Sequence, residues 1–362
     1  MNTGKPIKGR GAAGNPDNRF DSFSREDFDD GWGSLETAPN PDRRLIEDTT
    51  RSVIVRNDSP DVPFSQSINP YRGCEHGCIY CFARPTHAYL GYSPGLDFET
   101  RLHFKPDAAA RLREELARPG YRCEPIALGV NTDAYQPVER QLRITRSLLQ
   151  VMAETRHPVS LITKSALVER DIDLLRDLAQ DGLVEVMVSL TTLDRELARR
   201  MEPRAAAPRR RLQVIERLST AGIPVGVLVA PLIPFINDGE LETLLGQARQ
   251  AGALEAGYVL LRLPLEVGGL FEDWLAQHYP DRRERVMNRI RDCRGGRVND
   301  SRFGARMRGE GVYAELLRSR FDRAYRQLGF RTMAALERTL FGRPAGAAGG
   351  QLDLFGGPVF GG

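Results

Sequence analysis

The chain of 362 residues has little cysteine, and its five cysteines are too few and odd in number for a scaffold stapled by disulfides. It also has no stretch with the length and apolarity of a membrane span, and residues 1–6 lack the hydrophobic region of a signal peptide. These absences predict a protein of the reducing cytoplasm. The net charge of +3 is nearly neutral and does not by itself indicate a class of partner.

Three of the cysteines lie close together: Cys74, Cys78 and Cys81 form the spacing C-x3-C-x2-C, with no fourth cysteine nearby. Each iron of a [4Fe–4S] cluster normally takes one thiolate, so three protein ligands leave one iron open for a group that is not protein. The spacing therefore indicates an iron–sulfur cluster with an open coordination site.

Zinc is the alternative metal for this motif. His76 or His87 could complete a tetrahedral Cys3His set, although structural zinc sites usually pair two short knuckles and only one is present. The other two cysteines, Cys123 and Cys293, lie far from the motif, and we expect them to be small residues in or near the core.

Residues 73–82 also carry an aromatic residue in the last gap of the motif and glycines around the loop. This run resembles the signature of radical S-adenosylmethionine (SAM) enzymes. The resemblance implies that SAM chelates the open iron, that the cluster gives the sulfonium one electron, and that the 5′-deoxyadenosyl radical abstracts a hydrogen atom from substrate. The protein would supply the pocket, the orientation and the exclusion of water. An iron–sulfur protein that only tethers a partner is the non-catalytic alternative.

Between its two polar ends the chain alternates short apolar runs, suited to buried parallel strands, with amphipathic segments of helical period. Six strand–helix units predict a parallel sheet with helices outside, as either a doubly wound sheet or a curled barrel. The radical SAM resemblance implies the second, an α/β fold with a partial (β/α)6 barrel of the TIM type. The predicted strands are residues 65–69, 125–131, 159–164, 184–190, 224–231 and 257–263, and the predicted helices are residues 106–118, 138–155, 170–181, 208–221, 239–251 and 271–292.

Composition divides the chain into four parts. Residues 1–45 are poor in aliphatic side chains and predict a disordered N-terminal tail. We expect the barrel in residues 46–265, a helical arginine-rich extension in residues 266–341, and a flexible glycine-rich tail in residues 342–362. Arginines gather at residues 282–308, which indicates either a phosphate-binding stripe or a solvated helix face.

The ends of the predicted strands carry polar side chains, and ligands of such folds gather at the carboxyl ends of strands. Lys164 ends the third strand, and a lysine there is costly to bury without a partner. We therefore expect Lys164 to meet an anion, with the SAM carboxylate as the natural candidate. Small polar side chains at other strand ends could bond the ribose and amino groups of SAM or could cap helices instead: Asn131, Thr132, Ser189 and Thr191.

Several strings resemble the spore photoproduct lyase-like branch of radical SAM proteins, also described as DNA repair photolyase-like. The resemblance implies that Lys164 and Ser189 contact SAM. It also implies that the aromatic ring of Tyr80 and the backbone of Phe82 help to hold adenine. It also implies that the end of the second strand, including Asp133, belongs to the cofactor site. The matching strings are Asn69-Pro70-Tyr71-Arg72-Gly73-Cys74, residues 132–139, Thr163-Lys164-Ser165, Met201-Glu202-Pro203-Arg204 and Gly222-Ile223-Pro224-Val225.

One departure from this branch is informative. True lyases carry a cysteine near the end of the second strand that returns a hydrogen atom to the product radical, whereas this chain reads Asn131-Thr132-Asp133 there. Cys123 precedes that strand and so belongs to the wrong end of a barrel. We therefore do not predict a thymine-dimer lyase. The remaining candidates are Tyr135 or Tyr258 as hydrogen donors, or as packing residues, and Glu202 and Arg204 as substrate contacts, or as a surface ion pair.

The tail contains the string Gln351-Leu352-Asp353-Leu354-Phe355, which sets three apolar side chains in a segment with little else to pack. It resembles the motif that binds the bacterial DNA sliding clamp, and a tail folded back on its own domain is the alternative. Together the resemblances imply a DNA repair-like enzyme that acts on a nucleic acid, with a reductant such as flavodoxin or ferredoxin as a further partner. Modification of RNA, a protein or a small molecule is the alternative reaction.

Overall fold

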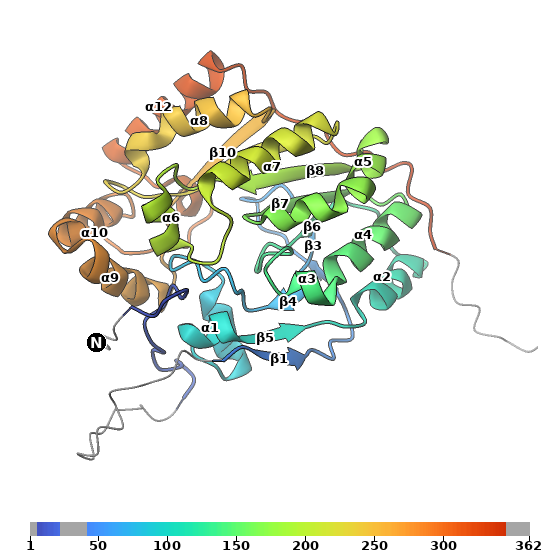
Figure 1. The fold of residues 1–362 in the computed structure, drawn as a ribbon, viewed down its shortest axis with the longest axis horizontal. Coiled ribbons are helices and arrows are strands. Elements are labelled where there is room, and N and C mark those ends of the chain that lie inside the picture. Colours follow the sequence, from blue (N-terminus) through green and yellow to red (C-terminus); the bar gives the residue numbers. More distant parts are fainter. Residues whose placement is uncertain (1–5, 22–41, 345–362) are drawn as a thin grey trace, which may run out of the picture.

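The computed structural model describes residues 6–21 and 42–344, and its centre is a sheet of seven strands in the order β10-β9-β8-β7-β6-β3-β2 (Figure 1). All neighbours are parallel except β2, which pairs with β3 in the antiparallel sense. The sheet is open, so the predicted partial barrel is confirmed. Its strands are β2 (Ile54–Arg56), β3 (Gln66–Ile68), β6 (Ile126–Leu128), β7 (Val159–Thr163), β8 (Val184–Ser189), β9 (Val225–Leu232) and β10 (Glu255–Leu260).

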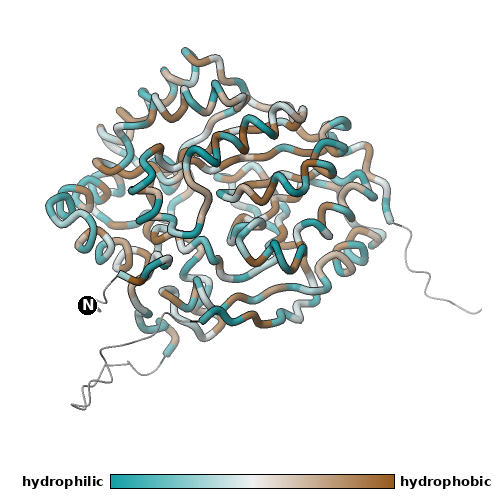
Figure 2. The backbone as a smooth tube through the Cα atoms, in the orientation of Figure 1, coloured by the Kyte–Doolittle hydropathy of each residue, from teal (hydrophilic) through white to brown (hydrophobic). Residues whose placement is uncertain are grey.

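The strands are short runs rich in β-branched and aliphatic residues, as parallel strands covered on both faces require. Pairings such as Val159 with Val184 and Val186 with Val225 set the strands in register. In Figure 2 the hydrophobic stretches follow the strands, whereas the helices alternate between hydrophilic and hydrophobic residues. Because the strands are parallel, the loops that follow them meet at one edge of the sheet.

Helices cover the outside of the sheet (Figure 1). The predicted helix over residues 138–155 is interrupted at Arg143, which adopts a left-handed φ of 54° between α3 and α4. The helices of this part are α2 (Ala108–Ala117), α3 (Glu139–Leu142), α4 (Ile144–Glu154), α5 (Ile172–Gln180), α6 (Arg195–Met201), α7 (Pro208–Thr220) and α8 (Leu241–Gln250), with the 3-10 turns η2 (Ala166–Asp171) and η3 (Asp238–Glu240).

A small second sheet lies beside the first, in the order β1-β5-β4. The sequence did not predict it, because its strands are too short and too polar to stand out. One 3-10 helix and one short α-helix connect β4 to β5 along the chain. The elements are β1 (Arg44–Glu47), β4 (Tyr71–Arg72), β5 (Arg101–Phe104), η1 (Arg84–Leu90) and α1 (Leu96–Thr100).

The prediction of a disordered N-terminal tail does not hold for residues 6–21. Asn15 exchanges hydrogen bonds with Asp97, and Asn18 donates to the carbonyl oxygens of Ala88 and Tyr92. The segment is held by polar partners from η1 and α1 rather than by apolar burial, which explains why its composition suggested disorder.

The C-terminal part contains four α-helices among the described residues. The predicted helix over residues 271–292 is in fact two helices, because the turn at Tyr279 and Pro280 separates them. No helix of the described chain has the length and apolarity needed to cross a membrane. The elements are α9 (Val267–His278), η4 (Pro280–Arg282), α10 (Arg283–Asp292), α11 (Ala305–Arg308) and α12 (Val312–Gln327).

After α12 the chain runs in extended form along the amino-terminal edge of the main sheet. Its backbone N–H groups at Arg331, Glu337 and Gly342 donate to carbonyl oxygens that precede strands β10, β8 and β7 in turn. We call residues 331–343 the edge strap. The predicted clamp-binding string, residues 351–355, lies outside the described residues.

Candidate active site

The loop over residues 73–82, here called the cluster loop, follows β3 and β4 at the carboxyl edge of the main sheet. Two of its glycines have left-handed backbones, Gly73 with φ of +82° and Gly77 with φ of +66°. A Cβ atom on Gly77 would lie 2.8 Å from Oε2 of Glu99, and one on Gly73 would lie 2.8 Å from the carbonyl oxygen of Phe98. The tight path of the loop therefore requires glycine at both positions.

The three cysteines of the loop are free thiols; Cys74 and Cys78 are buried and Cys81 is half-buried. Burial raises the pKa of Cys74, and the charges of Asp133, Cys78 and Cys81 raise it further. Burial, followed by the charge of Glu202, raises the pKa of Cys78 to about 12. Such thiols become thiolates only when a metal replaces the proton. The donor set therefore fits a cluster that binds three of its irons to protein.

The zinc alternative finds no support in the histidines. Nδ1 of His76 lies 3.3 Å from Asp133, and His87 packs against Phe98 with ring centroids 5.5 Å apart. In the described part of the chain, no three side chains of His, Cys, Asp or Glu lie close enough together to ligate a single ion. In a cluster each thiolate binds a different iron, which needs a wider spacing than one ion does.

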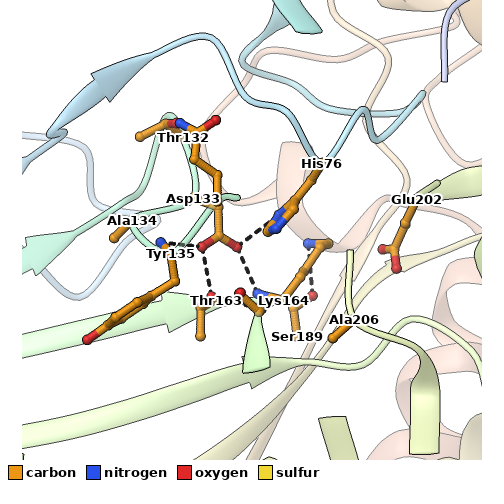
Figure 3. Close-up of polar contacts among 12 residues, drawn as sticks. His76, Thr132, Asp133, Ala134, Tyr135, Thr163, Lys164, Ser189, Glu202 and Ala206 are labelled. Atoms are coloured by element: carbon orange, nitrogen blue, oxygen red, sulfur yellow. Dashed lines mark hydrogen bonds and ion pairs between the residues drawn. The ribbon is translucent and has the colours of Figure 1, made fainter. Parts of the chain in front are cut away.

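Asp133, at the loop after β6, joins the cluster loop to the end of β7 (Figure 3). Its carboxylate pairs with His76 and accepts hydrogen bonds from the hydroxyl of Thr163 at 2.7 Å and from the backbone N–H of Lys164 at 2.8 Å. Burial alone would raise the pKa of Asp133, but His76 and these donors outweigh it and lower the pKa to about 2. Asp133 is thus an ionised carboxylate that holds the cluster loop and the end of β7 together. Its oxygen atoms are already engaged by protein groups rather than open to a cofactor.

Lys164 and Ser189, both predicted as SAM contacts, meet at the carboxyl edge of the sheet. Nζ of Lys164 donates to the hydroxyl of Ser189 at 3.0 Å and lies 5.9 Å from the ring centroid of Tyr80 (Figure 3). Within the described residues no carboxylate forms an ion pair with this ammonium. A cation held by one hydroxyl beside an aromatic ring is placed to receive an anionic group.

Glu202 bonds the phenol of Tyr80 and is buried among protein partners. It accepts hydrogen bonds from the phenol of Tyr80, the guanidinium of Arg211 and the hydroxyl of Thr191, the last at 2.7 Å. Burial acts to raise the pKa of Glu202, but the charges of Arg211 and Lys164 lower it to about 2. Glu202 therefore orients Tyr80, and the partners that the structure shows for its carboxylate are protein groups.

The segment 201–206 clamps the cluster loop through its backbone. The N–H of Ile79 donates to the carbonyl oxygen of Met201 at 3.0 Å, and the N–H of Arg204 donates to that of His76 at 3.3 Å. The guanidinium of Arg204 also pairs with the buried Glu75 at 3.3 Å. Arg204, the other predicted substrate contact, thus holds the cluster loop at His76 and Glu75.

The remaining predicted site residues fall into different surroundings. Thr132 is buried and donates to the carbonyl oxygen of Gly73, whereas Asn131 is exposed. Tyr135 points away from the Lys164 group (Figure 3) and packs in the main core. Tyr258 is likewise a core residue, packed against Phe321 with ring centroids 4.7 Å apart. Both tyrosines thus lie in the surroundings that the packing alternative predicted. Phe82 is 46% exposed.

Sequence reasoning missed the buried polar residues that hydrogen-bond to the backbone of the cluster loop and fix its path. Gln136 donates to Gly73 and accepts from the N–H of Glu75 at 2.8 Å. Arg84 donates to the carbonyl oxygens of Gly77 and Cys78 and pairs with Glu99 at 2.6 Å, with both side chains fully buried. Gln136 stood within the matching string 132–139, but nothing in the sequence paired Arg84 with Glu99.

The N-terminal segment completes this support. Glu99 accepts hydrogen bonds from the backbone N–H groups of Gly11 at 3.0 Å and Ala12 at 2.9 Å. Ala12 is buried in the same apolar cluster as Cys78 and Tyr80. Gly11 lies so close to the cluster loop that a Cβ atom there would come within 1.7 Å of the carbonyl oxygen of Gly77. Residues 11 and 12 therefore lie directly on the back of the cluster loop.

An open parallel α/β barrel with a loop of three free thiols at its carboxyl edge defines an iron–sulfur enzyme of the barrel type. More specifically, the chain belongs to the radical SAM superfamily, whose sequence model matches residues 68–248. Membership in this superfamily implies a [4Fe–4S] cluster and SAM.

Similar proteins agree with this assignment. An uncharacterized protein of Mycobacterium tuberculosis is 43% identical over 222 residues, and one of Methanocaldococcus jannaschii is 27% identical over 222 residues. Both alignments cover 61% of this chain, with 65% of the first relative and 79% of the second. The chain thus spans less than two thirds of the mycobacterial relative's length.

Among solved structures, spore photoproduct lyase complexed with dinucleoside spore photoproduct matches with a TM-score of 0.56 and 17% identity. The match covers 79% of this chain and 80% of the lyase. A form of the lyase with bound AdoMet and the same dinucleoside gives a TM-score of 0.55. At this identity the likeness concerns the fold.

Proposed function

We propose that this radical SAM enzyme takes a hydrogen atom from a nucleic acid, with a damaged base in DNA as the first candidate. The observation that carries the proposal is the convergence of the three free thiols with the Lys164–Ser189 pair at one edge of an open barrel. Support for the substrate comes from the lyase of similar fold, which was solved with a dinucleoside lesion, and from the resemblance of the strings around these residues.

In this proposal Cys74, Cys78 and Cys81 hold the cluster. When bound, the cluster and SAM supply the one-electron chemistry that removes a hydrogen atom from substrate. The chain's own residues bind and orient: the ammonium of Lys164 receives the SAM carboxylate, and Ser189 fixes that ammonium. The electron comes from a small redox protein of the flavodoxin or ferredoxin type.

Tyr80 would form one wall for adenine in the same site. Its ring is buried and its phenol donates to Glu202, which Arg211 holds in turn. This chain of hydrogen bonds fixes the ring before any ligand arrives, so little ordering remains to be done on binding. Burial of Tyr80 and Cys78 also keeps bulk water from the reacting groups.

The reaction differs from that of a lyase that returns hydrogen from a cysteine on the second strand. Asp133 occupies the end of that strand as a brace, and Cys123 precedes β6 at the opposite edge of the sheet. Burial raises the pKa of Cys123 to about 11, so this thiol is also a poor nucleophile. We therefore propose hydrogen abstraction with a different route for completing the product.

The test is anaerobic incubation with SAM, a reductant and DNA that carries defined lesions, with 5′-deoxyadenosine as the readout. We expect one lesion to raise 5′-deoxyadenosine formation above the level without DNA, and Cys81→Ala to abolish it. Stimulation by RNA, a peptide or a small metabolite, with no response to any DNA, would contradict the assignment to DNA.

A further inference from the structure

Arg262 follows β10 at the carboxyl edge of the sheet and has no carboxylate partner among the described residues. Its guanidinium donates to the thioether of Met307 at 3.5 Å and lies 5.4 Å from the ring centroid of Phe82. Its Nε is buried without a hydrogen-bond partner. Burial and the nearby charge of Arg306 lower the pKa of Arg262, and the charge of Asp61, which is itself paired with Arg306, offsets only part of this effect. A guanidinium in this state favours the arrival of an anion.

The location of Arg262 is set by the active site. Phe82 directly follows Cys81 and is the last residue of the cluster loop, so the guanidinium of Arg262 lies beside the end of that loop. Lys164, which also forms no ion pair among the described residues, follows β7, three strands away from β10 in the sheet order. The two cations therefore mark separate positions, of which Lys164 suits the cofactor and Arg262 suits a second ligand.

A loop of the C-terminal part completes the surroundings of Arg262. The buried Arg294 donates to the carbonyl oxygens of Leu260 and Leu261 at 3.0 and 2.9 Å and to that of Ala305 at 2.7 Å. These bonds fix α11 against the end of β10. Beside α11, Phe303 is 61% exposed, and its ring centroid is 4.7 Å from the guanidinium carbon of Arg306.

The acidic groups nearby are already occupied. Asp61 pairs with Arg306 and accepts from the N–H of Gly304 at 2.7 Å, and Asp300 pairs with Arg302 at 2.6 Å. By contrast, the earlier part of the predicted arginine stripe lies on α10, where Arg283 pairs with Glu272 and Arg289 with Asp292. Arg285 and Arg291 of α10 form no ion pair among the described residues either, but Arg285 lies over the ring of Phe235 and Arg291 donates to Asn288. Arg262 differs from them by its position at the carboxyl edge of the sheet, beside Phe82.

We propose that Arg262 binds a backbone phosphate of a single-stranded or locally opened nucleic acid, with the exposed rings of Phe82 and Phe303 as platforms for its bases. This inference rests on the proposed function and assigns the surface by which the substrate is held. Guanidinium groups beside exposed aromatic rings are the combination that single-stranded nucleic acids bind, because phosphates pair with the cation and bases stack on the rings.

The experiment is fluorescence anisotropy with a short labelled oligothymidylate and anaerobically purified holoprotein, titrated over a series of KCl concentrations. Each lost phosphate contact lowers the slope of log affinity against log salt by about 0.7 for a single strand. We expect Arg262→Gln to weaken binding about tenfold and to lower the slope by that amount. Arg326→Gln, the same change of charge at an exposed position of α12, is the matched control and should alter neither.

Two further variants keep the test informative. Arg262→Lys retains a positive charge and should keep the slope, and Phe303→Ala should weaken binding with the slope unchanged, because stacking releases no counterions. Arg262→Gln should bind SAM as the unaltered protein does, which separates this role from that of Lys164.

Two results would overturn the inference alone: unaltered binding by Arg262→Gln, or competition by polyglutamate as effective as that by unlabelled oligothymidylate. Absence of any salt-dependent binding by the unaltered protein would instead count against the proposed function as well.

Discussion

The ammonium of Lys164, at the end of β7, lies 3.0 Å from the hydroxyl of Ser189, at the end of the neighbouring β8. Two side chains 25 positions apart in the chain thus form one polar group, because adjacent parallel strands end at the same edge. Neither residue has an ionic partner among the described residues. The pair is therefore better explained by a ligand than by the stability of the fold.

Lys164→Ala should weaken SAM binding by about 1.5–3 kcal/mol, tenfold or more, because the SAM carboxylate loses a charge-assisted hydrogen bond. Iron content should stay normal. Isothermal titration of the anaerobic protein measures the effect, with Lys8→Ala, an exposed lysine of the N-terminal segment, as the control. Equal SAM affinity in both variants would exclude the role.

The three proposed cluster ligands predict which cysteine variants lose the visible absorption of an iron–sulfur cluster. Anaerobically prepared protein should be brown with about four irons per chain, and Cys74→Ala, Cys78→Ala or Cys81→Ala should each remove the absorption. Cys123→Ala and Cys293→Ala should retain it, because both thiols lie away from the cluster loop. Stoichiometric zinc after anaerobic reconstitution, without iron absorption, would contradict the cluster.

Gly11→Val should make the cluster labile. The new Cβ atom would come within 1.7 Å of the carbonyl oxygen of Gly77, so the N-terminal segment must move off the cluster loop. We expect iron to be lost to a chelator several times faster than in the unaltered protein. Gly120→Val is the control, because nothing lies within 4 Å of a Cβ at that position. Equal rates of iron loss in the two variants would show that the segment does not support the loop.

Acid should destabilise the protein partly through His157. Burial lowers the pKa of His157 to about 4, from an ordinary value of 6.5, while its ring bonds Tyr121 and the carbonyl oxygen of Pro158. Between pH 6.5 and pH 4 the unfolded chain is therefore protonated at His157 whereas the folded chain is not. The free energy of unfolding consequently falls as the pH drops through this range.

Between about pH 7 and pH 5 this histidine should cost roughly 2 kcal/mol of unfolding free energy. His157→Gln should lower stability at neutral pH but flatten the pH dependence in denaturant unfolding. Burial also lowers the pKa of His87 to about 4, so His87 should account for the pH dependence that remains in this variant. A pH dependence as steep as that of the unaltered protein would refute this account.

The tail string is testable without a substrate. A peptide spanning residues 349–357 should bind the bacterial sliding clamp with micromolar affinity, since a short flexible peptide buries little area and must be ordered on binding. Replacing Leu354 and Phe355 with Ala should abolish binding and leave iron content and SAM cleavage intact. If neither the peptide nor the full chain binds the cognate clamp, the proposed partner is wrong.

Much of the fold could be predicted from local pattern. Apolar runs identified β3 and the strands from β6 to β10, and the rule that parallel strands end together put Lys164 and Ser189 in one site. The cysteine spacing alone indicated the metal centre. Each of these signals lies within a few neighbouring residues or follows from sheet topology.

The supports of the site could not be predicted, because they depend on partners far apart in the chain. Glu99 lies 88 positions from Gly11, and nothing local marks either residue. Glu202 and Arg204 looked like free polar groups in a loop, yet Arg211 and Glu75 engage them. A charged residue shows its role only once its counterion is known.

The edge strap has a consequence for how the enzyme meets other molecules. It carries the chain beneath the starts of β10, β8 and β7, and Arg338 pairs with Glu124 just before β6. Residue 344 thus leaves the folded body at the pole opposite the cluster loop. A partner bound to the chain beyond that point would therefore approach the enzyme from the amino-terminal edge of the sheet and leave the edge that carries the cluster loop open to a substrate.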